Sequence, residues 1–163
     1  MYSSLSKIFI YILIFFSFLS NLNAYSSNQK VLYSRKSVSN YFSGVISSNN
    51  NNNKLALKYF NNLHHLKNNH DQFNRKMVFT LVQTKKIPEL FLYLKKLKKK
   101  NLNFFDANLL LGISYFLEKN YIKSTNYFNL IIQTKKFSNF EKLIAQSLLS
   151  YIKVFENRLN DYK

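Results

Sequence analysis

A recurrence with a period of about 34 residues is the feature of this sequence that most restricts its fold. Written in three rows that begin at Ser37, Asp71 and Phe105, the chain brings similar residues into the same columns. Column 4 is Asn in all three rows, and column 23 is Tyr in all three. Such self-similarity is typical of repeat arrays, in which each unit buries its apolar face only against its neighbours.

The remaining matched columns hold small, aliphatic or aromatic residues. They are column 8 (Gly44, Val78, Gly112), column 20 (Ala56, Leu90, Ser124), column 24 (Phe60, Leu94, Phe128) and column 27 (Leu63, Leu97, Ile131). The match extends over residues 37–138. Because two short helices cannot bury their apolar faces alone, the rows are expected to stack into one continuous core.

Each row contains two amphipathic stretches separated by a polar break. In the second row Ile87, Leu90, Leu94 and Leu97 recur at helical spacing, while lysines fill the other face. The chain has only two Gly and one Pro, too few for the turns of a β-sandwich or barrel. The pattern therefore predicts an all-α fold built from helix pairs.

Local signals predict where these helices begin and end. Pro88 has the fixed φ that suits the first turn of a helix, and Asp106 is a plausible N-cap for a helix over residues 107–117. Breaks are expected at residues 49–53, where Asn tolerates a left-handed backbone, and at residues 118–120.

The third row carries the clearest family pattern. Its residues Leu111-Gly112, Tyr115, Tyr121, Ser124, Phe128 and Ile131 lie at columns that tetratricopeptide repeats fill with Leu-Gly, Tyr, Tyr, a small residue, an aromatic and a small residue. The sequence resembles that family, and is similar to exported members from AT-rich marine alphaproteobacteria, although column 4 is Asn where the family prefers Trp. The resemblance implies a right-handed superhelical α-solenoid with repeats at 37–70, 71–104 and 105–138.

The C-terminal segment after the third row is predicted to form one helix. Phe140, Leu143, Ile144, Leu148, Leu149, Ile152 and Phe155 share one side of it and would cover the exposed core of the third repeat. Residues 139–163 are therefore expected to be either a capping helix or the first half of a fourth repeat.

The N-terminus is typical of a secretory signal peptide. Lys7 precedes an apolar run over residues 8–19, which is shorter than the ~20 residues of a membrane span, and Ala24 offers a small residue for cleavage. We expect a signal peptide at 1–24 and a polar linker at 25–36. The chain lacks any Asn-x-Ser/Thr sequon, which favours the bacterial periplasm. Retention at the membrane by an uncleaved signal is the alternative.

Residue types argue against catalysis and against a metal site. The chain has no Cys, its three His are grouped at residues 64–70 without zinc-site spacing, and its seven acids are scattered singly. Two Gly cannot supply a phosphate-binding loop. We expect no enzyme activity, no metal and no cofactor.

The resemblance implies a binding groove on the first helix of each repeat. In the family, columns 20, 24 and 27 face the core, while columns such as 2, 5, 9 and 12 face a ligand. The expected partner-binding residues are Tyr41 and Val45 in the first row, Gln72, Arg75, Phe79 and Val82 in the second, and Leu109, Ile113 and Phe116 in the third. This mostly apolar set favours an apolar segment of another polypeptide.

Two alternatives to that groove stay open. Some of its residues could pack in a tighter superhelix or against the last helix. The Asn residues of column 4 could hydrogen-bond a ligand backbone, or they could bond across neighbouring repeats.

The charge of +17 supports a second functional hypothesis. A chain this basic attracts polyanions, so a Lys-rich face could hold an anionic component of the envelope. The run at residues 95–100 is equally typical of a solvated face near a helix end. Since the chain is expected to be exported, nucleic acid is not an expected partner.

Overall fold

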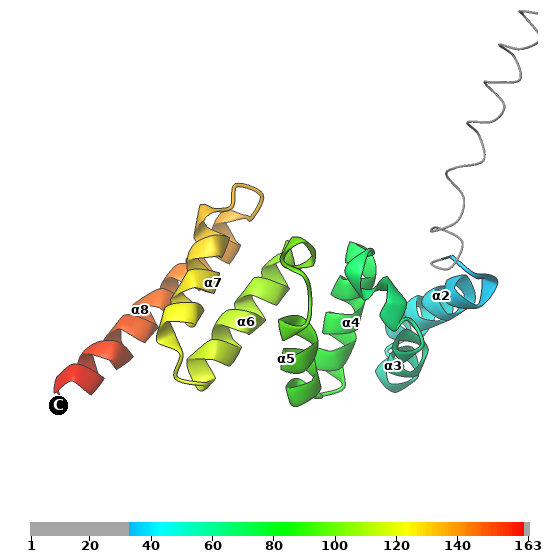
Figure 1. Ribbon diagram of the computed structural model, residues 1–163, viewed down its shortest axis with the longest axis horizontal. Coiled ribbons are helices and arrows are strands. Elements are labelled where there is room, and N and C mark those ends of the chain that lie inside the picture. Colours follow the sequence, from blue (N-terminus) through cyan, green and yellow to red (C-terminus); the bar gives the residue numbers. More distant parts are fainter. Residues whose placement is uncertain (1–32, 162–163) are drawn as a thin grey trace, which may run out of the picture. The chain divides into compact units, whose positions relative to one another are not determined.

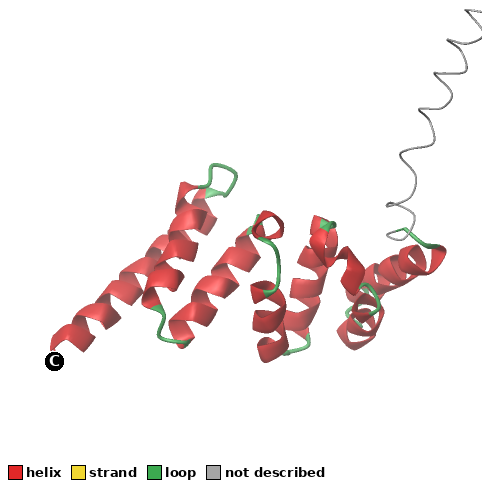
Figure 2. Ribbon diagram, viewed as in Figure 1, coloured by secondary structure: helices red, strands yellow, loops and turns green. Residues whose placement is uncertain are grey.

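The computed structural model describes residues 33–161. By its contacts the chain divides into two units, residues 1–38 and 39–163, and only residues 33–38 of the first are described. Within residues 33–161 there are seven α-helices and two short 3₁₀ helices, with no strand (Figure 2). The all-α prediction is confirmed. The predicted signal peptide and most of the predicted linker lie outside the described residues.

The α-helices recur at a fixed interval along the chain. Their bounds are α2 Arg35–Asn49, α3 Asn53–Asn61, α4 Asp71–Gln83, α5 Ile87–Lys95, α6 Phe105–Leu117, α7 Tyr121–Gln133 and α8 Asn139–Asp161. The 3₁₀ helices η2 (His64–Asn68) and η3 (Lys99–Leu102) precede α4 and α6. From α3 to α8 each helix packs against the next (Figure 1). By these bounds α3, α5 and α7 begin at equal intervals, and so do α4, α6 and α8, with the period of the sequence rows.

The same tight turn joins the two helices in three places. Asn51, Lys85 and Lys119, which all stand at the same column of the rows, have φ of 59°, 57° and 58°. The N–H of each donates to the carbonyl three residues earlier, and the next N–H donates to the carbonyl five residues earlier. This is the Schellman pattern that ends an α-helix. Since a left-handed conformation costs a residue with a Cβ about 1–2 kcal/mol, the packing of the two helices must hold both lysines there.

The two predicted breaks are confirmed and each is followed by a capped helix, whereas only one of the two predicted helix starts is confirmed. Asn52 and Asn120 cap α3 and α7 by accepting a backbone N–H three residues later, at 3.3 and 3.2 Å. Pro88 lies in the first turn of α5, as predicted. The prediction of Asp106 as an N-cap is wrong, because α6 already begins at Phe105. Asp106 lies inside the first turn, where its charge faces the positive end of the helix dipole.

The two helices of a pair approach each other closely at columns 8 and 24. A Cβ built on Gly44 would lie 2.4 Å from Cε1 of Phe60, and one built on Gly112 would lie 2.4 Å from Cε1 of Phe128. In the middle repeat the same columns hold Val78 and Leu94, which are both buried. A larger residue at column 8 thus goes with a smaller one at column 24. The two columns vary as a unit because they share one packing space.

The columns expected to face the core are buried in all three repeats. Columns 20, 24 and 27 comprise Ala56, Leu90 and Ser124; Phe60, Leu94 and Phe128; and Leu63, Leu97 and Ile131, none of them more than 7% exposed. The polar member, Ser124, donates a hydrogen bond from its Oγ to the carbonyl of Gly112 at 2.8 Å. That bond satisfies the hydroxyl and ties α7 to α6.

The last helix, α8, starts in register with the first helices of the repeats but runs past their turn. Ser138 and Glu141 form a capping box: the Glu141 N–H donates to Ser138 Oγ at 3.3 Å, and the Ser138 N–H donates to Glu141 Oε2 at 2.7 Å. At Lys153, which stands one period after Lys119, the chain stays helical instead of turning. Helix α8 is therefore a long capping helix that begins like a repeat.

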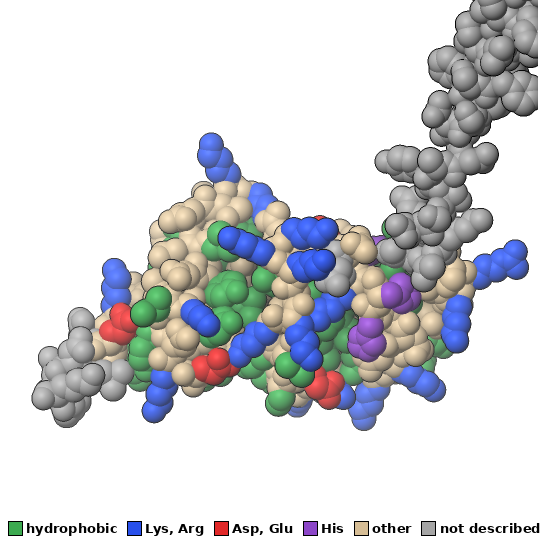
Figure 3. All heavy atoms as spheres, in the orientation of Figure 1, with side chains coloured by type: hydrophobic (Ala, Val, Ile, Leu, Met, Phe, Trp, Pro, Cys, Tyr) green, Lys and Arg blue, Asp and Glu red, His purple; other side chains and the backbone are tan. Residues whose placement is uncertain are grey.

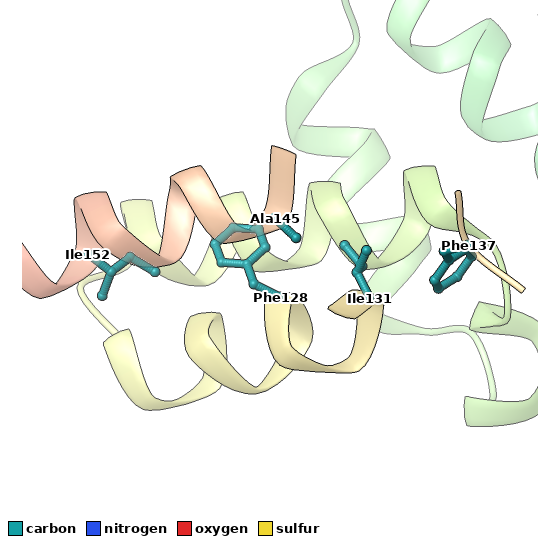
Figure 4. Packing of buried hydrophobic residues seen from close by; sticks show 5 residues of the cluster. All are labelled: Phe128, Ile131, Phe137, Ala145 and Ile152. Carbon is teal, nitrogen blue, oxygen red and sulfur yellow. The ribbon is translucent and has the colours of Figure 1, made fainter. Parts of the chain in front are cut away.

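Helix α8 packs against α7 and α6. Ala145 and Ile152 of α8 are buried together with Phe128, Ile131 and Phe137 (Figure 4).

Two residues expected in the buried stripe of α8 do not belong to it. Phe140 and Leu143 are 71% and 58% exposed, so the prediction is wrong for them. The stripe that packs runs through Ala145, Leu148 and Ile152. At 3.6 residues per turn, positions 140 and 143 lie well off the face that contains these three residues.

Replacing Gly112 by Ala should lower the free energy of unfolding. A Gly to Ala change inside a helix ordinarily stabilises by about 0.5–1 kcal/mol, but here the new Cβ meets the buried Phe128 ring, and overpacking costs about 1–3 kcal/mol. Urea denaturation measures the difference. The double variant Gly112→Val with Phe128→Leu, which copies the middle repeat, should be more stable than Gly112→Val alone. An increase in stability for Gly112→Ala would contradict the close approach of α6 and α7.

Candidate functional site

The predicted groove residues of the first two repeats remain accessible. On α4, Phe79 and Val82 are 48% and 38% exposed, and Arg75 is exposed with its guanidinium carbon 4.8 Å from the centroid of the Phe104 ring. Gln72 is also exposed. On α2, Tyr41 and Val45 are half-buried.

The predicted groove residues of the third repeat are half-buried, as Tyr41 and Val45 are, but they pack against other parts of the chain. Leu109, Ile113 and Phe116 pack against the cluster that α7 and α8 bury. The Phe116 ring lies 5.5 Å from the Phe155 ring and 6.1 Å from the Tyr151 ring, both on α8. The nine predicted residues therefore do not form one continuous exposed row. In the third repeat, two rings of α8 contact Phe116 at this face.

The Asn residues of column 4 on α4 and α6 bond within the fold. Asn74 Nδ2 donates to the carbonyl of Lys67 at 2.9 Å, and Asn108 Nδ2 donates to the carbonyls of Leu102 and Phe104 at 2.9 and 3.0 Å. Both Asn side chains are buried, and each reaches the segment that ends the preceding row. Of the two alternatives for this column, bonding across neighbouring repeats is confirmed for these two residues.

The middle and third repeats differ in whether the Oδ1 atom of this Asn accepts a hydrogen bond. In the middle repeat the Tyr93 hydroxyl donates to Asn74 Oδ1 at 2.6 Å, and burial raises the pKa of Tyr93 above its ordinary value. In the third repeat Tyr127 stands at the same column, but its ring stacks on the Tyr115 ring at 5.6 Å and 11°. Asn108 Oδ1 is left buried without a hydrogen-bond partner. Buried acceptors are almost always paired, so this atom needs an explanation.

A second difference between these repeats lies at column 31. In the first row this column holds Lys67, whose Nζ lies 5.0 Å from the centroid of the Tyr93 ring. In the second row it holds Asn101, whose shorter side chain instead donates to the carbonyl of Lys67 at 3.2 Å. The ring of Tyr127 therefore has no equivalent lysine from column 31 beside it.

A cavity of about 970 Å³ is lined by Asn108 and Tyr127, at the place where the third repeat lacks the tyrosine–asparagine hydrogen bond and the lysine of the middle repeat. We call it the α5–α7 cleft, because its walls come from α5 and α7, with α6 and η3 between them. Its lining includes Asn108 and the stacked pair Tyr115 and Tyr127. Its apolar lining residues are Leu94, Leu97, Leu102, Leu130 and Phe137. This size is that of a site for a drug-sized ligand or a short polypeptide segment.

Lysines surround the α5–α7 cleft. Lys95, Lys99, Lys100 and Lys123 line it, and the Nζ atoms of Lys95 and Lys123 lie 5.0 and 5.2 Å from the centroid of the Tyr115 ring. Figure 3 shows hydrophobic side chains exposed between α5 and α7 with lysine and arginine side chains around them.

Only one of the four cleft lysines forms a salt bridge among the described residues. Lys95 forms a salt bridge with Glu118, and its hydrogen bond holds the pKa of that carboxyl below its usual value. Lys99, Lys100 and Lys123 form no salt bridge within residues 33–161. The rim of the cleft therefore carries a net positive charge.

Comparisons with protein-family models, with curated proteins and with solved structures found no match for this chain. Among residues 33–161, no helix has the length and apolar character that a membrane crossing requires. The same residues contain no group of three or more His, Asp or Glu placed to hold a metal ion. Function is therefore inferred from the geometry.

The sequence pattern did not predict the α5–α7 cleft. The run of lysines at 95–100 was visible, but a solvated helix end explains such a run equally well. Helix α5 ends at Lys95, and the chain then folds through η3 so that Lys99 and Lys100 line the cavity. The available signal was the difference at column 31, which is Lys67 in the first row and Asn101 in the second. It could be interpreted only with the structure, which places the Lys67 Nζ beside the Tyr93 ring.

Replacing Tyr93 by Phe should cost about 1–3 kcal/mol of stability, because it leaves Asn74 Oδ1 buried without a donor. The matched variant Tyr127→Phe should stay within about 0.5 kcal/mol of the wild type, because the Tyr127 hydroxyl makes no hydrogen bond to a described residue. Urea denaturation of the two variants provides the comparison. Equal losses of stability for the two variants would mean that both tyrosine hydroxyls form a stabilising hydrogen bond, which would contradict this account.

The cost of Tyr93→Phe should also depend on pH. The pKa of Tyr93 is raised in the folded chain. Its contribution to stability is therefore full below the pKa of an unfolded tyrosine, about 10, and is lost as the pH rises through the folded-state value. The stability difference between wild type and variant should be constant at neutral pH and shrink above pH ~10. A difference that grows with pH would contradict the buried hydrogen bond.

Proposed function

We propose that this chain is an exported helical-repeat protein of the tetratricopeptide kind that binds a segment of another polypeptide and catalyses no reaction. The regular recurrence of helix starts, Schellman turns and close helix contacts supports the repeat assignment. The right-handed superhelix is part of the same proposal. The sequence of residues 1–24 supports export to a bacterial periplasm, with retention by an uncleaved signal as the variant of that proposal.

The observation that carries the proposal is the exposed apolar pair Phe79 and Val82 on α4. The two side chains are three residues apart, so they lie on one face of the helix, and both are at least 38% exposed. They occupy the columns that face a ligand in the resembled family. Exposed apolar groups in such a row suit the apolar side chains of a bound helix or extended segment.

The proposed groove is shorter than the sequence alone implied. Its remaining members are Tyr41 and Val45 on α2 and Gln72, Arg75, Phe79 and Val82 on α4, since Leu109, Ile113 and Phe116 are half-buried against the cluster that α7 and α8 form. A groove formed by two first helices accommodates a short segment. The bound length should therefore be a few residues rather than a long peptide.

A second candidate function rests on the lysines. Lys99, Lys100 and Lys123 line one cleft without forming a salt bridge among the described residues, which favours an anionic surface or polyanion as the ligand. The two candidates differ in their response to salt. Contacts made by many lysines weaken steeply as ionic strength rises, whereas apolar contacts do not.

Phe79→Ala should weaken partner capture and leave stability within about 0.5 kcal/mol of the wild type. Phe116→Ala should lower stability by about 1–3 kcal/mol, because the Phe116 ring packs against α8. Thermal denaturation measures stability, and proteins retained from a periplasmic extract at low and at raised salt measure capture.

The control for that experiment is Ile122→Ala, which removes an apolar side chain that is 76% exposed on α7 and lies outside the groove. The same proteins should be retained by the wild type and by Ile122→Ala at both salt concentrations and be lost with Phe79→Ala. Capture that disappears for every variant at raised salt would favour the anionic-surface candidate.

Export is tested separately from binding. An alkaline phosphatase reporter, which is active only outside the cytoplasm, should be active when fused after residue 30. Replacing Phe15 by Asp should abolish that activity, because a charge interrupts the apolar run of the signal. Activity that is absent from the unaltered fusion would refute the proposed compartment.

A further inference from the structure

The α5–α7 cleft contains a buried acceptor that the fold leaves unpaired. Asn108 is only 1% exposed, its Nδ2 bonds two carbonyls of the preceding segment, and its Oδ1 has no partner. Asn108 also lines the cleft. Because the Oδ1 atom is itself buried, a donor from the cleft reaches it only when a neighbouring side chain shifts, and it would then complete the hydrogen bonds of this side chain.

The middle repeat identifies the kind of donor that fits. There, at the equivalent position, a tyrosine ring donates its hydroxyl to the Asn Oδ1, and the Nζ of Lys67 lies 5.0 Å from the centroid of that ring. In the third repeat Tyr127 turns instead onto Tyr115, and Asn101 is too short to replace Lys67. The missing group is thus an aromatic ring that carries a hydroxyl.

The positive charge at the opening of the cleft limits the kind of ligand that can insert such a ring. Lys95, Lys99, Lys100 and Lys123 line the cavity, and Glu118, which bridges Lys95 and also attracts Lys123, supplies one negative charge against these four positive ones. Leu130, which is 41% exposed on α7, offers an apolar edge at the same opening. Carboxylates beside the inserted ring would meet the lysines, while the ring itself would meet the apolar walls.

We propose that the α5–α7 cleft binds an acidic polypeptide segment that inserts a tyrosine side chain and donates its hydroxyl to Asn108 Oδ1. The segment takes the place that Tyr93 and Lys67 fill in the preceding repeat. This site is distinct from the groove on α2 and α4, so it holds whether or not Phe79 binds a partner.

The experiment uses the full chain and three fluorescein-labelled heptapeptides. One has a central tyrosine flanked by three acidic residues on each side, the second replaces that tyrosine with phenylalanine, and the third replaces the acidic residues with lysines. Fluorescence anisotropy should show the tyrosine peptide binding about tenfold more tightly than the phenylalanine peptide. The lysine-flanked peptide should not bind.

Matched variants test the location of the site. Leu130→Glu places a charge at the cleft, whereas Ile122→Glu places the same charge on the same helix outside it. The first variant should abolish binding of the tyrosine peptide, and Ile122→Glu and Phe79→Ala should leave it within about twofold of the wild type. The double variant Lys99→Gln with Lys100→Gln should also weaken binding, which keeps the test valid if Leu130→Glu fails to fold.

Two results would overturn the proposal. Equal affinity for the tyrosine and phenylalanine peptides would mean that no hydroxyl reaches Asn108, as expected if Tyr127 itself swings onto this atom. Equal losses from Leu130→Glu and Ile122→Glu would mean that acidic peptides bind the basic surface in general.

Discussion

The close contact of two helices across columns 8 and 24 is the interaction on which the rest of the structure depends. At Gly44 and Gly112 the first helix approaches the Phe ring of the second so closely that a Cβ would lie 2.4 Å from a ring carbon. The same left-handed turn occurs in the middle repeat, where Val78 and Leu94 replace the Gly and the Phe, so the packing of the two helices holds even lysines in this backbone whether or not column 8 is Gly. The buried columns 20, 24 and 27 then follow from the geometry of the pair.

Much of the fold could be predicted because the period is a property of the sequence itself. The correctly predicted features depend on neighbouring residues or on the partner helix within one repeat. They are the packing at columns 8 and 24, the helix start near Pro88 and the break at residues 118–120. Apart from the N-cap of α6, which lies two residues before Asp106, the errors occurred where a longer-range contact decides the outcome. Phe140 is exposed because α8 packs along Ala145 and Ile152, and nothing local in its sequence selects that face over the adjacent apolar one.

The candidate sites were less predictable than the fold. Position in the repeat frame correctly left Phe79 accessible, but it could not reveal that α8 contacts Phe116, since that depends on where a helix outside the three repeats packs. The cleft depends on one substitution within the frame, from Lys67 to Asn101, and on the rotation of one ring. A departure from the repeat pattern is thus informative where the repeats otherwise agree, because the space that the missing side chain would fill stays open.

The central claim, that the chain is built from interchangeable units one period long, is tested most directly by tandem duplication of residues 71–104. If the claim is right, the enlarged chain should unfold in one cooperative transition at or above the midpoint of the original, because the new pair packs on both neighbours. Duplicating residues 71–100 instead, which shifts the register by four residues, should destroy that transition. Equal behaviour of the two duplications in thermal denaturation followed by circular dichroism would contradict the claim.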